Sequence, residues 1–139
     1  MQKIITFFLI DDDLDDQEFF MLALRDINPE IKCIMAKDGC EALEIIKKNK
    51  DFIPDFIFLD LNMPRVNGKE CLVEMKKIEQ LKNTPIYIYS TSSTNRDKIE
   101  MAELGAKSCI KKPCTIKELV SVLSQVISAT DTQLVSKKL

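Results

Sequence analysis

The stretch Phe7-Phe8-Leu9-Ile10-Asp11-Asp12-Asp13 decides the fold, because a short apolar run ends abruptly in carboxylates. Three later apolar runs also end on a polar residue suited to phosphate chemistry: Phe56–Leu59 on Asp60, Ile86–Tyr89 on Ser90, and Cys109–Ile110 on Lys111-Lys112-Pro113. If the four runs are parallel strands of one sheet, their ends open on the same edge, where ligands bind in open α/β sheets. The sequence therefore predicts three carboxylates, a hydroxyl and an ammonium in one crevice.

Apolar runs of four to eight residues alternate along the chain with longer segments of helical period. This alternation is typical of βαβ units around a parallel sheet, and the missing polar alternation within the runs indicates strands buried on both faces. We expect five strands near residues 4–10, 31–36, 55–60, 85–90 and 107–111, with helices between them and after the last.

The helices differ in how clearly the sequence predicts them. The last helix is the clearest, with one apolar stripe and a capping-box pattern at Thr115. The fourth helix, about 95–104, has the weakest stripe, formed by Ile99, Ala102 and Ala106, so we expect it to be poorly buried. After Ala129 the chain is polar. We therefore predict one domain over residues 1–129 and a short polar tail without its own fold over 130–139.

Composition excludes several classes of function. The 139 residues suffice for one domain, and a net charge of −2 gives no basic surface for nucleic acid. No apolar run approaches the roughly 20 residues that span a bilayer, and no signal peptide is recognised, so we expect a cytoplasmic protein. The five cysteines are odd in number and unpaired in spacing, which favours free thiols. The absence of histidine removes the usual nucleophile pairs and most zinc sites.

Asp60 is the strongest single candidate for a functional residue. A carboxylate directly after a buried central strand lies at its mouth, although a turn aspartate that begins the next loop has the same pattern. The segment Asp60-Leu61-Asn62-Met63-Pro64, followed by Gly68, favours function over the turn. Pro64 and Gly68 predict a tight loop that can aim a backbone carbonyl at a bound metal.

Asp11 and Asp12 stand together at the end of the first strand. Like charges so close together disfavour joint ionisation unless a cation lies between them. Magnesium takes oxygen ligands and uses one or two carboxylates together with phosphate oxygens. An acidic helix start is the alternative reading, and we assign it to Asp13, Asp15 and Asp16.

Lys112 and Ser90 are the candidates for binding a phosphoryl group. Lysine binds phosphate as a point charge, and Lys111 beside it should point to the opposite face and be solvated. Ser90 can donate a hydrogen bond to a phosphoryl oxygen. The hydroxyl-rich run that follows is also ordinary turn chemistry, so the register is open and Thr91 is the neighbouring candidate.

These residues, taken in order, resemble the motif set of the two-component response-regulator receiver domain, over about residues 4–129: Asp11-Asp12, Asp60-x-Asn62-Met63-Pro64, Ser90 and Lys112-Pro113. The resemblance implies a flavodoxin-like, doubly wound α/β fold with five parallel strands in the order 2-1-3-4-5 and five flanking helices. The loop over residues 50–54 and the Ser90-Thr91-Ser92 run are similar to single-domain regulators partnered with phytochrome-type kinases.

The resemblance also implies a mechanism. Asp60 accepts a phosphoryl group from a sensor histidine kinase or a histidine phosphotransfer protein, and the chain catalyses only its own phosphorylation and dephosphorylation. Mg²⁺ is held by Asp12, Asp60 and the main-chain carbonyl of Asn62, with Asp11 acting through water or orientation. Ser90 (or Thr91) and Lys112 bind the phosphoryl oxygens. Output is binding of a downstream protein through about residues 95–129, and a homodimer is a further option.

Two positions depart from the family pattern. Serine stands at position 90 in place of the usual threonine, which preserves the hydroxyl. Cys109 stands where the family usually has tyrosine or phenylalanine, an aromatic ring that turns inward when the hydroxyl engages the phosphate. A thiol cannot reproduce that movement, so Cys109 is the position at which the switch should differ.

Two other functions fit parts of the pattern. A haloacid-dehalogenase-type phosphatase would use Asp11 as the nucleophile of an Asp-x-Asp motif, but it should have threonine or valine where Leu14 stands. A receiver that has become a constitutive interaction module is conceivable because of Cys109. The complete set of carboxylates and lysine argues against it.

Overall fold

The computed structural model describes residues 4–63 and 67–138, and the side chains of residues 4–63 and 67–129. Five strands alternate with five helices, and a short 3₁₀ helix (Glu79–Leu81) precedes the fourth strand. The strands are β1 (Thr6–Ile10), β2 (Lys32–Ala36), β3 (Phe56–Leu59), β4 (Ile86–Ser90) and β5 (Ser108–Lys111). The helices are α1 (Leu14–Ile27), α2 (Gly39–Lys48), α3 (Gly68–Lys76), α4 (Asn95–Glu103) and α5 (Ile116–Lys138).

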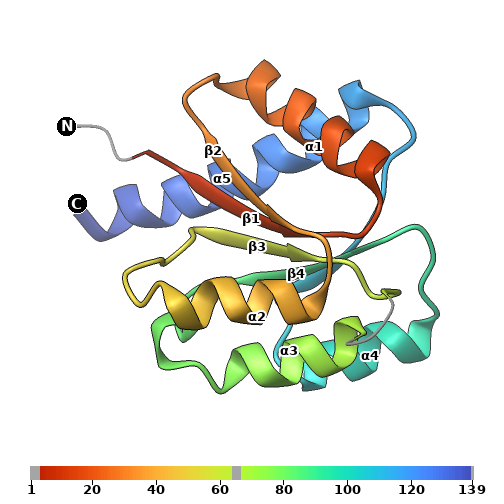
Figure 1. Cartoon of the computed structure of the whole chain (residues 1–139). Coiled ribbons are helices and arrows are strands. Elements are labelled where there is room, and N and C mark those ends of the chain that lie inside the picture. The colour runs from red at the N-terminus through yellow and green to blue at the C-terminus, as the bar shows by residue number, and fades with distance from the viewer. Residues whose placement is uncertain (1–3, 64–66, 139) are drawn as a thin grey trace.

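All five strands are parallel and lie in the order β2-β1-β3-β4-β5 (Figure 1). The predicted flavodoxin-like architecture is therefore confirmed. In the register, Ile10 pairs with Ala36 on one side and with Leu59 on the other, and Ser90 pairs with Lys111. Because paired strands end level with one another, the residues that follow them meet at one edge of the sheet.

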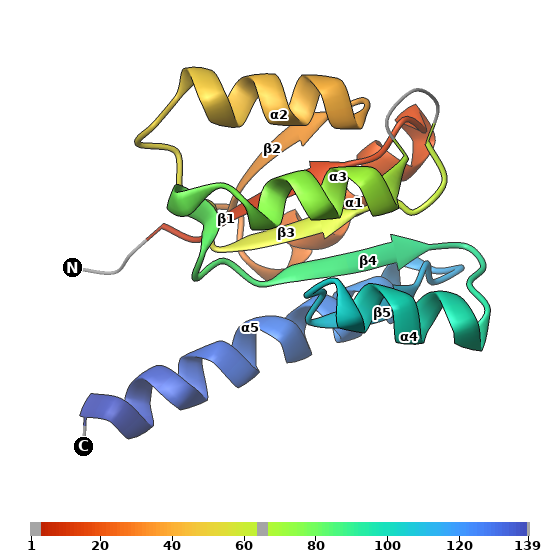
Figure 2. The same cartoon turned by 90° about the horizontal axis from the view of Figure 1, so that it is seen from below.

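The helices cover the two faces of the sheet unequally: α1 and α5 lie on one face, and α2, α3 and α4 on the other (Figures 1 and 2). Successive strand residues point to opposite faces. Aromatic side chains gather under α1 and α5, where Phe58 contacts Phe20, Tyr87 and Tyr89. Aliphatic residues such as Ile57 fill the other face, and each face forms its own continuous core.

Side-chain caps begin all five helices, and at α5 the Thr115 Oγ1 accepts a 3.1 Å hydrogen bond from the N–H of Glu118. Asp13, Asp38 and Asn67 accept hydrogen bonds from backbone N–H groups at the starts of α1, α2 and α3. Thr94 and Asp97 form a reciprocal capping box at the start of α4. These caps satisfy N–H groups that have no partner within the helix, so each helix starts at a defined residue after its strand.

The weak burial predicted for α4 is confirmed, but the predicted stripe is wrong. Ile99 is 62% exposed and Ala102 is also exposed, whereas Met101 is fully buried and is the one buried residue of the helix. The sequence pattern failed because a single large apolar side chain anchors the helix, which leaves no periodic signal.

The last helix is longer than predicted. α5 continues to Lys138, through most of the segment 130–139 that was predicted as a polar tail. The segment 130–138 is polar but contains neither glycine nor proline, so nothing in it stops a helix once the preceding turns have formed. The limit of the domain at residue 129 stays a prediction.

Candidate functional site

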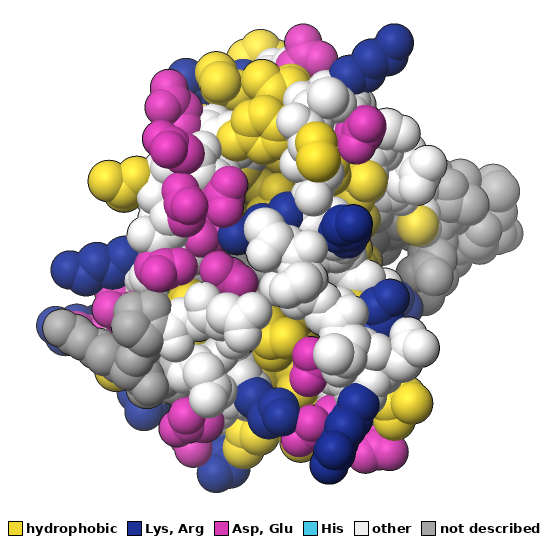
Figure 3. Space-filling view, turned by 90° about the vertical axis from the view of Figure 1, so that its right-hand side faces the viewer, with side chains coloured by type: hydrophobic (Ala, Val, Ile, Leu, Met, Phe, Trp, Pro, Cys, Tyr) yellow, Lys and Arg dark blue, Asp and Glu magenta, His cyan; other side chains and the backbone are white. Residues whose placement is uncertain are grey.

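The residues that follow the strand ends meet around the ammonium group of Lys112. Its Nζ lies 2.8 Å from Oδ2 of Asp11, 2.8 Å from Oδ2 of Asp16 and 3.5 Å from Oδ2 of Asp60. The Lys112 side chain is only 8% exposed, whereas Lys111 is exposed, as strand alternation predicts. Figure 3 views this edge of the sheet and shows acidic side chains gathered beside basic ones.

Three carboxylates of this edge could hold one metal ion. Asp11, Asp12 and Asp60 each offer an oxygen atom, and these oxygens lie within 4.8 Å of one another. Oδ2 of Asp11 is buried and faces the Lys112 ammonium at 2.8 Å, so a metal ion bound there would compete with that contact. Asp12 is exposed and opens the cluster to solvent. An all-oxygen donor set of this kind suits a hard divalent cation such as Mg²⁺ or Mn²⁺.

Burial and charge shift the pKa values at this edge. Burial raises the pKa of Asp11 from 3.8 to about 6, although the Lys112 ammonium and the Asp13 N–H favour the ionised form. Burial also raises the pKa of Asp60, against the attraction of Lys112. Burial alone would lower the pKa of Lys112, but its contacts with Asp11 and Asp16 outweigh burial and raise it. The ammonium therefore stays charged while the carboxylates hold excess negative charge.

These shifts predict how pH affects the metal-free protein. Because the folded pKa of Asp11 is about 6 and its ordinary value is 3.8, the folded state binds more protons between these pH values. The contribution of Asp11 to stability is present below pH 4 and is lost as the pH rises through 6, by about 3 kcal/mol. In EDTA, the unfolding free energy of Asp11→Asn relative to the unmutated protein should therefore increase over this range, as followed by denaturant titration. A pH-independent difference would contradict the raised pKa.

Asn62 and Gly68 shape the loop after Asp60. The backbone N–H of Asn62 donates a hydrogen bond of 3.2 Å to Oδ1 of Asp60, which fixes the carboxylate over its own loop. Gly68 is buried at the start of α3, and its N–H bonds to the carbonyl of Leu61. Pro64, the other predicted loop residue, lies outside the described residues. The metal-ligand role of the Asn62 carbonyl stays a prediction.

Gly68 leaves no space for a side chain. A Cβ there would lie 2.4 Å from the carbonyl oxygen of Asp60 and 2.7 Å from Cα of Leu61, both backbone atoms that cannot rotate away. Gly68→Ala should therefore displace the peptide that carries Asp60, lower the unfolding free energy by about 1–3 kcal/mol, and weaken metal binding at the site.

Gly105 offers the matched control for Gly68. Its φ of 105° makes alanine unfavourable there, but its Cβ would meet only the flexible side chain of Lys76. Gly105→Ala should cost comparable stability, about 1–3 kcal/mol, without changing metal affinity. Thermal unfolding and Mg²⁺ titration of the two variants would separate the effects. Equal metal affinity in both variants would show that Gly68 does not position Asp60.

The hydroxyl of Ser90 is close to the site but is engaged with its own loop. Ser90 is 3% exposed, and its Oγ donates a hydrogen bond of 3.0 Å to the carbonyl of Ser92. Thr91 is exposed. The backbone of Ser90 accepts a 2.8 Å hydrogen bond from the N–H of Lys112, which ties the two phosphoryl-binding candidates together. Of the two hydroxyls, the structure thus places that of Ser90 in the interior.

Cys109 is half-buried on β5 and packs against the core on the α4 side. A surface cavity of about 250 Å³ lies beside it, lined by Lys98, Ala102, Ala106 and Ser108. Burial raises the pKa of the Cys109 thiol, so it stays protonated near neutral pH. The small side chain therefore leaves space between α4 and β5.

Comparison with known proteins agrees with this geometry. Residues 7–124 match the response regulator receiver domain. This chain belongs to the receiver domain family. Chemotaxis protein CheY of Thermotoga maritima is 30% identical over 113 residues, which are 81% of this receiver and 92% of CheY. Response regulator Rcp1 of Synechocystis is 27% identical over 124 residues, 86% of this receiver and 84% of Rcp1.

Solved structures give the same result. The Mn²⁺-bound form of Rcp1 has a TM-score of 0.77 and 26% identity, covering 89% of this receiver and 92% of that chain. The phosphorylated cyanobacterial phytochrome response regulator RcpA has a TM-score of 0.80 and 26% identity, covering 89% of this receiver and 91% of the RcpA chain. Receiver domains also occur within longer relatives, of which this chain spans as little as 6%. The family is a signalling domain, and nothing in the comparisons supports the haloacid-dehalogenase reading.

Sequence reasoning missed one residue of this receiver's site. The sequence pattern predicts Asp16 as part of an acidic helix start, but its carboxylate binds the Lys112 ammonium at 2.8 Å, whereas Asp13 is the helix cap. The signal was present in the sequence. Asp16 precedes the buried Phe20 by four residues and Ala23 by seven, so it lies on the face of α1 that packs against the sheet. An acid on that face needs a partner.

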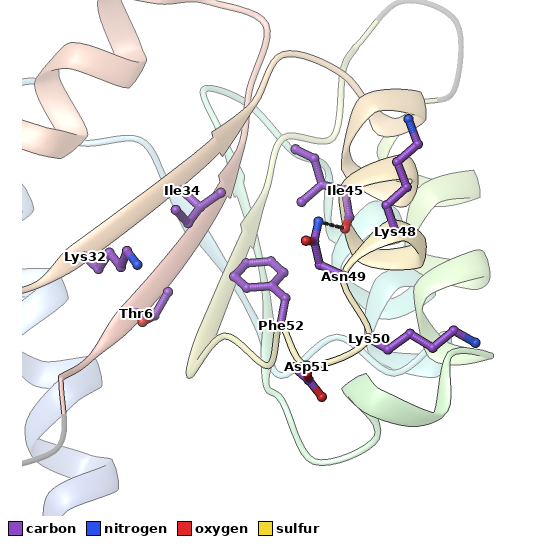
Figure 4. A pocket seen from close by; sticks show the side chains of 9 residues that line it. All are labelled: Thr6, Lys32, Ile34, Ile45, Lys48, Asn49, Lys50, Asp51 and Phe52. Atoms are coloured by element: carbon purple, nitrogen blue, oxygen red, sulfur yellow. Dashed lines mark hydrogen bonds between the residues drawn. The ribbon is translucent and has the colours of Figure 1, made fainter.

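A cavity away from this edge of the sheet carries no such chemistry. A cavity of about 530 Å³ lies at the opposite end of the strands, between the starts of β1 and β2 and the end of α2 (Figure 4). Its lining includes Phe52, while the side chains of Lys48 and Lys50 extend away from it.

Within residues 4–63 and 67–138, no helix has the length and apolarity needed to cross a bilayer.

Proposed function

We propose that this receiver accepts a phosphoryl group on Asp60 from a phosphohistidine of a sensor kinase or phosphotransfer protein. The single observation that supports this most is the enclosure of Asp60 by two further carboxylates and one ammonium at the carboxyl edge of the sheet. In the transfer, a carboxylate oxygen of Asp60 attacks phosphorus, the O–P bond forms as the P–N bond breaks, and the imidazole of the donor, already protonated on its other ring nitrogen, leaves as the neutral ring. The chain has no histidine and cannot be the donor itself.

Each neighbour of Asp60 has a separate task in this proposal. Asp12, Asp60 and the Asn62 carbonyl would hold Mg²⁺, with Asp11 beside them, and the cation would neutralise charge on the phosphoryl oxygens. Lys112 binds the phosphoryl group from the other side. Ser90 binds it after its hydroxyl leaves the carbonyl of Ser92. Rate acceleration then comes from positioning and charge stabilisation, as in phosphoryl transfer generally.

Output in this proposal is protein binding. We propose the surface of α4, β5 and α5 for a downstream protein, within residues 95–129. We propose a phytochrome-type kinase as the phosphodonor, because the receiver is similar in structure to RcpA. We also propose that the protein is cytoplasmic.

Incubation with acetyl phosphate and Mg²⁺ tests the proposal. Intact mass should show one acid-labile phosphoryl adduct, and EDTA should prevent it. Size-exclusion chromatography of the same sample would report whether phosphorylation changes the oligomeric state. Absence of any adduct at millimolar Mg²⁺ would contradict the proposal.

The position of Cys109 predicts a route for the switch that needs no aromatic side chain. Ser90 releases Ser92 when it binds the phosphoryl group, and the following loop leads directly into α4, whose one buried residue is Met101. Few apolar contacts hold such an element in place. Hydrogen exchange with and without beryllofluoride, a phosphoryl mimic, should therefore change most within residues 90–104.

Cys109→Ser tests this route, because it changes one atom of the side chain. The exchange response within residues 90–104 should be retained, and Ser90→Ala, which cannot bind the phosphoryl oxygen, should lose most of it. If Cys109→Ser lost the response while Asp60 was still phosphorylated, the cysteine itself would be the relay.

A further inference from the structure

Lys112 has a carboxylate partner that the proposed chemistry does not use. Asp16, in the first turn of α1, accepts a hydrogen bond of 2.8 Å from Nζ of Lys112. This contact is as short as that between Nζ and Asp11, and shorter than the 3.5 Å contact with Asp60. The Asp16 side chain is 33% exposed while that of Lys112 is 8% exposed, so the pair joins a buried ammonium to the rim of the site.

We propose that Asp16 is a positioning residue that holds the Lys112 ammonium beside Asp60 while metal and phosphoryl group occupy the other carboxylates. The inference rests on the proposed function and adds a residue to its machinery. Asp16 would act through Lys112 and would touch neither the metal nor the phosphoryl group.

The number of donors on the ammonium supports this role. A lysine ammonium has three N–H donors, and three carboxylates surround this one: Asp11, Asp16 and Asp60. A metal ion held by Asp12 and Asp60, with Asp11 beside it, would compete with Nζ for the carboxylates of Asp60 and Asp11. Asp16 is then the one carboxylate of the three left to Lys112. With Asp16 in place, one donor stays fixed and the others can turn to a phosphoryl oxygen.

The flexible stem of Lys112 makes such a holder necessary. Lysine loses rotamer entropy when its long side chain is fixed, and its ammonium group is strongly hydrated. Nζ also lies over the Tyr89 ring, 5.5 Å from its centroid. Such a contact attracts the cation but does not fix its direction. A carboxylate at hydrogen-bond distance, such as that of Asp16, fixes the direction of the ammonium group.

The simplest alternative is that Asp16 only stabilises the start of α1. Acidic residues in a first helical turn interact favourably with the helix dipole, and Asp15 occupies the same turn. Asp15 is exposed and has no ion pair with Lys112. Asp15→Asn therefore removes the same charge from the same turn and leaves Lys112 in place, which makes it the matched control.

The test compares the initial rate of Asp60 phosphorylation by acetyl phosphate at saturating Mg²⁺. Asp16→Asn should slow it by about tenfold, as expected for one hydrogen bond to a charged group, while Asp15→Asn should not. Mg²⁺ affinity should not weaken in either variant, and Asp16→Glu should recover part of the rate. In a Lys112→Ala background, Asp16→Asn should have no further effect. Thermal unfolding of each variant shows that it is folded.

Each outcome decides between the possibilities. If the unmutated protein gave no adduct, the proposed function would be lost and this inference with it. If it was phosphorylated and Asp16→Asn matched Asp15→Asn, only the inference would be overturned. An equal slowing by Asp16→Asn with and without Lys112 would also overturn it, because Asp16 would then act independently of the ammonium.

Discussion

Asp60→Asn should abolish the acid-labile phosphoryl adduct while leaving the protein folded. The amide oxygen of asparagine is not nucleophilic enough to attack phosphorus. Asparagine has nearly the shape of aspartate, however, and can fill the position of Asp60, which is 7% exposed. The pKa of Asp60 is raised by burial, so its ionised form is unfavourable in the metal-free fold. Removing that charge should raise the melting temperature in EDTA, which excludes misfolding as the cause of the lost adduct.

Asp38→Asn is the control for Asp60→Asn. Asp38 is a buried aspartate of similar exposure, 6%, and it caps α2 through a hydrogen bond to Glu41 N–H that asparagine can also accept. Its variant should be phosphorylated at the unmutated rate. An adduct of undiminished yield in Asp60→Asn would place the acceptor elsewhere.

Lys112→Ala should slow phosphorylation on the order of 10²-fold, the usual cost of losing one group that stabilises developing negative charge. The metal-free protein should also lose about 3 kcal/mol of stability, because the carboxylates of Asp11, Asp16 and Asp60 would face one another without a cation. Mg²⁺ should restore most of that stability, since the metal no longer competes with Nζ for Asp11.

Thermal unfolding with EDTA and with Mg²⁺, together with the phosphorylation rate, tests these effects of Lys112. The exposed neighbour Lys111 gives the control variant, Lys111→Ala, which should change neither the thermal stability nor the phosphorylation rate. Lys112→Arg should rescue the rate poorly, because its wide planar fork does not match a compact ammonium held by three carboxylates. Weaker Mg²⁺ binding in Lys112→Ala would show that the lysine supports the metal and not the phosphoryl group.

The order of the elements was predictable because the fold depends on period and polarity. Buried strands lack polar alternation, and their polar ends identify the edge where ligands bind, which placed Asp11, Asp60 and Lys112 together. The polar composition after residue 129 does not show where α5 ends, because polar residues extend a helix that has already begun unless glycine or proline interrupts it.

The finer contacts of the site depend on tertiary distance. The sequence separation of 96 residues between Asp16 and Lys112 gives no local signal, and only the face of α1 on which Asp16 lies could have indicated a partner. The engagement of the Ser90 hydroxyl with Ser92 is likewise a property of the folded loop. The contact of Asp16 with Lys112 and that of Ser90 with Ser92 are the two that our proposals use to explain how the site changes on phosphorylation.

Chemical mapping of the phosphoryl group tests the central claim most directly. After incubation with acetyl phosphate and Mg²⁺, borohydride reduction converts an aspartyl phosphate to homoserine, which peptide mass spectrometry can locate. The account predicts homoserine at position 60, and none when EDTA is present. Homoserine at position 11, as expected for a dehalogenase-type nucleophile, would contradict it.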